Sequence, residues 1–111
     1  MFGAPIIGDI WAQTAQIKDK ENGSVILDVS DEHGGLYKQA KMPERFFQST
    51  FLPHPSIPDT YIKRVRIEDV EVDHISFVLV NLNGKPINTG TQVSKIRKKL
   101  FLETYHLDNS L

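Results

Sequence analysis

The chain contains no cysteine, and this absence excludes several kinds of chemistry at once. It rules out disulfide bonds, thiol nucleophiles, and zinc or iron–sulfur sites with cysteine ligands. Long hydrophobic runs are also missing, since no stretch approaches the roughly eighteen apolar residues of a membrane-spanning helix. The N-terminus has no basic residue ahead of its short apolar stretch and does not match a secretory signal. We therefore expect a soluble, cytoplasmic protein with no membrane partner.

Recognisable catalytic motifs are missing too. The sequence holds neither the G-x-S-x-G of a nucleophile elbow nor the G-x-G-x-x-G of a dinucleotide-binding turn. Gly84-Lys85 is followed by Pro86 and lacks the upstream glycine of a phosphate-binding loop. We predict no catalytic and no cofactor-binding residues, and we keep an enzyme without a recognisable motif as the remote alternative.

The four histidines give no metal signature. None is spaced two or four residues from another, the separations that place two imidazoles on one face of a strand or a helix. Acidic residues do flank histidines in the segment 31–33 and at Asp73-His74. Each pattern is compatible with a solvated turn or with a general base or metal ligand, and we predict no metal site.

Charge of one sign is not in excess, because the formal net charge is −1. This balance argues against a protein whose whole surface holds nucleic acid. Basic residues gather locally, however, at Lys63-Arg64-x-Arg66 and at Lys95-x-Arg97-Lys98-Lys99. A local basic face therefore remains open.

The sequence does contain strong signals for β-structure. Asn22-Gly23 and Asn83-Gly84 stand between extended segments, and this dipeptide favours two-residue hairpin turns with positive φ. From residue 64 to 73 apolar and polar residues alternate, and the phase changes at Glu68-Asp69, which predicts a bulge. The segment 75–80 is apolar on both faces, which predicts a central strand. The new phase makes Val72 a strand residue, and Pro86 marks the returning strand as an edge.

Two short helices are expected, near 43–52 and 94–105. Pro43 suits the first turn of the first helix, and Ser94 is a candidate N-cap for the second. Phe47 and Phe51 share one helical face, and we assign them to the core together with Phe46.

These segments form an internal echo, because strand, turn, extended segment and short helix occur twice. The aligned helix ends match Phe47 with Phe101, Thr50 with Thr104, and Phe51 with Tyr105, while Gly34 matches Gly84. We predict a mainly β (β-rich α+β) fold, a small, strongly bent SH3-like or OB-like barrel. It forms one domain over 1–111, with pseudo-repeated half-units of about 8–52 and 61–107 and a proline-rich connector at 53–60. Coincidence of two common units is the alternative to duplication.

The preferred function is a small non-enzymatic protein-interaction module, an inhibitor or adaptor that occupies a partner's surface. The alternative is a nucleic-acid-binding small β-barrel that uses the basic clusters at 63–66 and 95–99. Another protein is the expected partner, nucleic acid is the second, and a homo-oligomer is compatible with the sequence. The predicted partner-binding residues combine amphipathic aromatics with the basic clusters: Trp11, Tyr37, Tyr61, Lys63, Arg64, Arg66, Lys95, Arg97, Lys98 and Lys99.

Overall fold

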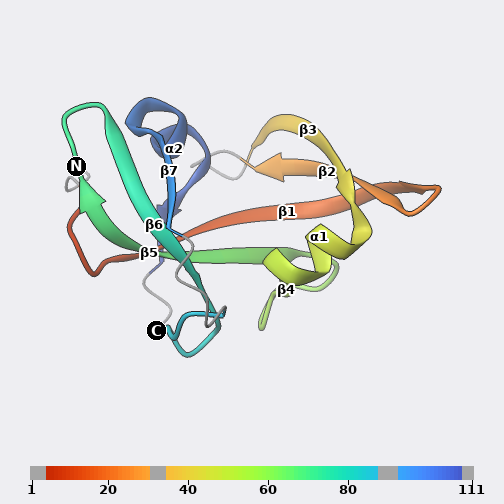
Figure 1. The fold of residues 1–111 in the computed structure, drawn as a ribbon. Coiled ribbons are helices and arrows are strands. Elements are labelled where there is room, and N and C mark those ends of the chain that lie inside the picture. The colour runs from red at the N-terminus through yellow and green to blue at the C-terminus, as the bar shows by residue number, and fades with distance from the viewer. Residues whose placement is uncertain (1–4, 31–34, 88–92, 109–111) are drawn as a thin grey trace.

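A computed structural model describes residues 5–30, 35–87 and 93–108, and Figure 1 shows its fold. The chain is mainly β with two short helices, as predicted. In chain order the elements are β1 (Ile10–Glu21), β2 (Ser24–Ser30), β3 (Leu36–Pro43), α1 (Glu44–Thr50), β4 (Leu52–Pro53), β5 (Tyr61–Val70), β6 (His74–Val80), β7 (Ser94–Arg97), α2 (Lys98–Thr104) and β8 (His106–Leu107).

The strands form one antiparallel sheet bent into a half-barrel. Its order is β3-β2-β1-β5-β6-β7, so the two longest strands, β1 and β5, pair at the centre. Both run across the molecule in Figure 1, with α1, β2 and β3 at one end and α2, β6 and β7 at the other. The short strands cross over, because β4 pairs with β5 and β8 pairs with β1.

Local sequence signals explain the first hairpin and the predicted bulge. Asn22 and Gly23 have φ values of 42° and 82°, the positive values that a type I′ turn needs. The pairing of β5 with β6 shifts register between Ile67 and Asp69, where the alternation changes phase. Both predictions are confirmed.

The second Asn-Gly turn does not lead directly into a strand. The side-chain oxygen of Asn81 accepts hydrogen bonds from the backbone N–H groups of Asn83 and Lys85, at 2.8 and 3.1 Å. These N–H groups bind a side chain, and Val80 and Pro86 form an isolated β-bridge rather than part of a strand. On the side of β6 away from β5, the neighbouring strand is β7, which begins at Ser94.

Both helices are shorter than predicted. The helix expected over 94–105 begins at Lys98, and Ser94 is a strand residue rather than an N-cap. Tertiary pairing decides this difference, because β7 bonds to β6 and pairs Ile96 with Ile75. α1 covers 44–50 of the expected 43–52 and ends where Pro53 disfavours helical backbone just before it.

The core consists of two clusters with stacked aromatic rings, each built mainly from one half of the chain. The first contains Phe47 and Phe51, whose rings stack 5.3 Å apart. The second contains Phe101 and Tyr105, whose rings stack 4.5 Å apart. Assigning Phe46 to the core is wrong, because it lies on the outer side of α1 and is 52% exposed.

Several contacts of the first half recur in the second. At the start of each helix, a backbone N–H donates to a hairpin-tip carbonyl at 2.8 Å, from Glu44 to Gly23 and from Lys98 to Asp73. Each edge strand also forms an ion pair with the hairpin of its own half. Lys41 on β3 pairs with Glu21 at 3.3 Å, and Lys95 on β7 pairs with Glu71 at 2.8 Å. Glu44 and Lys98 therefore occupy corresponding positions in the two halves. By the same alignment Pro43 corresponds to Arg97 and Arg45 to Lys99. Gly34, part of the predicted echo, lies outside the described residues.

Candidate partner-binding surface

Trp11 does not lie on an exposed surface, and that part of the predicted site is wrong. Its side chain is only 6% exposed and belongs to the second core cluster. Its ring centroid lies 5.3 Å from that of Phe101. The pairing of β1 with β5 sets Trp11 opposite Val65, another buried residue. A Trp11→Ala variant therefore tests the core rather than a binding surface.

The two tyrosines of the predicted site belong to different strands. Tyr61 begins β5, is half-buried, and meets the ring of Phe47 edge-on with centroids 5.0 Å apart. Tyr37 lies in β3, and its side chain is outside the described part of the structure.

The first basic cluster is largely engaged within the protein. Lys63 is half-buried, with its Nζ atom 5.8 Å from the ring centroid of Tyr105, and burial lowers the pKa of its ammonium group. Arg66 pairs with Glu68 on the same strand at 3.3 Å. Arg64 is 3% exposed, so its assignment to a binding surface is wrong.

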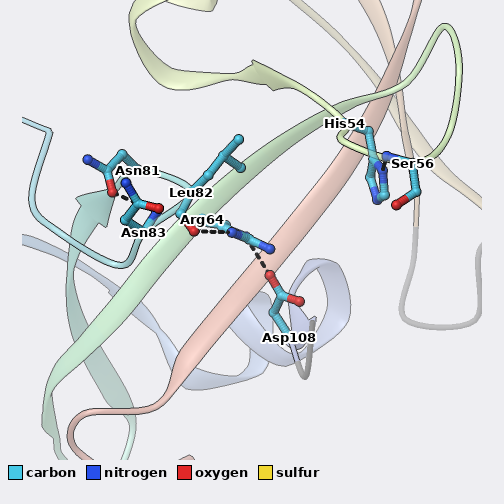
Figure 2. Close-up of polar contacts among 7 residues, drawn as sticks. All are labelled: His54, Ser56, Arg64, Asn81, Leu82, Asn83 and Asp108. Carbon is cyan, nitrogen blue, oxygen red and sulfur yellow. Dashed lines mark hydrogen bonds and ion pairs between the residues drawn. The ribbon is translucent and has the colours of Figure 1, made fainter. Parts of the chain in front are cut away.

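Arg64 instead forms a buried ion pair that holds the C-terminal segment. Figure 2 shows its guanidinium between the carboxylate of Asp108 and the carbonyl oxygen of Leu82. It donates to that carbonyl at 2.9 Å, and the Asp108 side chain is 7% exposed. Because Asp108 follows β8, this pair fastens β8 and β5 together through side chains.

The second basic cluster lies partly on β7 and partly on α2. Lys95 pairs with Glu71, and the hydrogen bond to that carboxylate raises the pKa of Lys95. Arg97 and Lys99 are exposed and Lys98 is half-buried. Within residues 5–30, 35–87 and 93–108, these last three cations form no ion pair.

These three cations line an open groove beside the β5–β6 turn. We call it the basic groove, and its lining is Val72, Asp73, His74, Arg97, Lys98, Lys99, Leu102 and Glu103. The hydrogen bond from the Lys98 N–H to the Asp73 carbonyl holds the start of α2 against the turn. His74 pairs with Asp73 at 2.8 Å and thereby lowers the pKa of that carboxyl group.

Val72 is the residue that sequence reasoning missed. β5 ends at Val70, so Val72 sits in the turn and is 95% exposed. The available signal was its position between Glu71 and Asp73, since two flanking acids fit a solvated turn as well as an alternating strand. An apolar side chain held out at a hairpin tip is a candidate anchor for a partner.

A second, smaller groove lies beside α1 in the first half. Its lining is mostly apolar, and the ion pair between Lys20 and Glu44 at 3.3 Å stands at its margin. Its lining residues are Ile17, Lys20, Glu44, Phe47, Gln48, Phe51, Leu52, Pro53 and Tyr61. The basic groove differs from it by its exposed valine and by three cations that form no ion pair with any residue the structure describes.

His106 gives a pH-dependent prediction for stability. Burial lowers the pKa of this half-buried imidazole below 6.5, with Asp108 acting in the opposite direction and His54 in the same direction. Above pH 6.5 the folded and unfolded states are both neutral at this site. Below pH 6.5 the unfolded chain takes up the proton first, so stability falls as pH drops towards the folded pKa.

We therefore expect the melting temperature to fall between about pH 7.5 and pH 5.5, where histidines titrate. His106→Gln should show a smaller fall, measured by circular dichroism at both pH values. An equal fall in the variant and the parent would contradict the assignment, and His54→Gln controls for the neighbouring imidazole.

No cluster of three or more metal-binding side chains occurs in the part of the chain that the structure covers. The acid–histidine segment 31–33 lies outside the described residues, and Asp73-His74 forms the pair described above. Among the same residues, neither helix has the length and apolar character needed to cross a membrane.

Comparison with known proteins adds no relative to this picture. The chain matches no protein-family model, no curated protein and no solved structure.

Proposed function

We propose that the protein is a small, non-enzymatic protein-interaction module that acts in the cytoplasm by occupying a partner's surface through the basic groove. The observation that carries this proposal is the 95% exposure of Val72, at the tip of a hairpin fixed to α2 by a backbone hydrogen bond. An apolar anchor beside charged residues is the usual make-up of a protein-binding hot spot with a polar rim.

The charges favour protein over nucleic acid as the partner. A nucleic-acid surface needs a continuous row of free cations facing the phosphates. Here Arg64 is buried with Asp108, and Lys95 is paired with Glu71. The remaining cations share their groove with two carboxylates, those of Asp73 and Glu103.

We also propose that the echo between the two halves reflects an internal duplication. The recurring ion pairs, helix-start hydrogen bonds and aromatic pairs support it. Under this proposal the first half supplies matched control positions, because Asn22 stands at the tip of its hairpin where Val72 stands in the second half. Self-association remains a prediction, which sedimentation velocity of the purified protein would test.

Affinity capture from the cells that make the protein tests the proposed function. Val72→Asp should reduce capture of a specific partner at least about tenfold, because it places a charge where the complex would bury an apolar side chain. Asn22→Asp adds the same charge at the tip of the first hairpin and should capture the partner like the parent. Circular dichroism should show both variants folded, since both positions are exposed.

The proposal would be contradicted if Val72→Asp retained every protein that the parent captures. It would also be contradicted if Asn22→Asp lost the same proteins to the same extent, because the loss would then follow from added charge anywhere on the surface.

A further inference from the structure

We infer that the basic groove binds an acidic segment of a partner protein that also carries an apolar side chain. This inference rests on the proposed function and adds the chemistry of the partner to it. Carboxylates of the segment would pair with Arg97, Lys98 and Lys99, while its apolar side chain would pack against Val72 and Leu102, which line the same groove.

The charge of the groove is the first argument. Three consecutive cations stand at the junction of β7 and α2, and none of them forms an ion pair within the described ranges. The positions related to Arg97, Lys98 and Lys99 in the first half hold Pro43, Glu44 and Arg45, where positive charge does not accumulate. The positive charge therefore belongs to this groove and not to the architecture that the halves share.

The geometry of the cations points to carboxylates. The guanidinium of Arg97 can bind both oxygens of one carboxylate, which adds directional specificity to the charge. The backbone bond between Lys98 and Asp73 holds the cations beside the hairpin tip that bears Val72. One short segment can thus reach charged and apolar contacts together.

The apolar part separates a protein segment from a nucleic acid. Val72 is 95% exposed and Leu102 is half-buried, so both offer surface that a phosphate backbone cannot use. A regular row of phosphates would also approach Asp73 and Glu103, which line the groove. An acidic peptide can avoid these two carboxylates, because its charges need not be evenly spaced.

An NMR titration of the isotope-labelled full chain tests the inference. The probe is a peptide of about twelve residues built from Glu and Asp with two leucines, a length that fills a typical peptide groove. Its controls are the same peptide with serine for leucine, the same peptide with lysine for its acids, and a single-stranded oligonucleotide. Each is titrated at about 50 and about 300 mM salt, a range over which surface electrostatics weaken.

The acidic leucine peptide should shift the amide signals of Val72–His74 and Arg97–Leu102, and the higher salt should weaken its binding. Arg97→Glu with Lys99→Glu should weaken it at least about tenfold, since charge reversal turns attraction into repulsion. Val72→Ser should weaken it up to about tenfold, the equivalent of burying one valine. Arg45→Glu, the matched exposed position on α1, should leave the affinity unchanged.

The inference is overturned if the lysine peptide binds as well, if the charge-reversed variant binds like the parent, or if shifts appear elsewhere. Tighter binding of the oligonucleotide, with no benefit from leucine, would replace it by phosphate recognition. If the acidic peptide does not bind while cellular capture still depends on Val72, this inference fails and the proposed function stands. If capture is also independent of Val72, both fail.

Discussion

Asp108→Ala will lower the free energy of unfolding by about 3–5 kcal/mol, the usual loss when one partner of a buried ion pair is removed. The variant leaves the guanidinium of Arg64 in a site where that side chain is 3% exposed. Only its hydrogen bond to the Leu82 carbonyl would remain of the two contacts in Figure 2. Chemical denaturation followed by circular dichroism measures the loss.

Two variants make this result specific to the buried charge. Arg64→Met combined with Asp108→Leu should recover much of the lost stability, because apolar residues of similar size remove the unpaired charge. Recovery will be incomplete, since the Leu82 carbonyl loses its donor. Lys41→Ala breaks the exposed pair with Glu21 and should cost less than about 1 kcal/mol. If Asp108→Ala also cost less than about 1 kcal/mol, the ion pair between Arg64 and Asp108 would be solvated and not buried.

Phe101→Ala will also lower the free energy of unfolding by about 3–5 kcal/mol, because it opens a cavity in a closely packed cluster. Phe101 is fully buried, and its ring centroid lies 4.5 Å from Tyr105, 5.3 Å from Trp11 and 5.8 Å from Phe77. No comparable loss is expected for Phe46→Ala, since Phe46 is 52% exposed on α1.

Phe101→Ala also tests whether the two core clusters unfold together. Strands β1 and β5 contribute residues to both clusters and pair with each other at the centre of the sheet. We therefore expect Phe101→Ala to show one transition, shifted as a whole to lower denaturant concentration. Two separate transitions would mean that each half is stable alone.

Much of the fold could be predicted because its signals are local. Asn22-Gly23 fixes a tight turn through its own backbone preference, and the phase change at Glu68-Asp69 records a bulge within one strand. The four-residue spacing of Phe47 and Phe51 likewise predicts a shared helical face from local sequence alone. These features depend on residues a few positions apart, so a single sequence contains them.

The candidate site was harder to predict because exposure depends on distant segments. Arg64 and Arg66 share a strand and a basic pattern, but only Arg64 meets the carboxylate of Asp108 and is buried. Trp11 is covered by Phe101, ninety residues further along the chain. The sequence marked Arg97, Lys98 and Lys99 as candidates, whereas it gave no sign that Val72 lines the same groove.

The sequence by itself determined the mainly β composition, the positions of the first hairpin and the bulge, and the aromatic residue that directly follows each helix. The tertiary structure decided where α2 begins and which cations are paired with carboxylates. It also decided which apolar side chain, that of Val72, stays exposed beside the cations of the basic groove. Backbone preferences act over a few residues, whereas burial and ion pairing depend on segments that meet only in the folded chain.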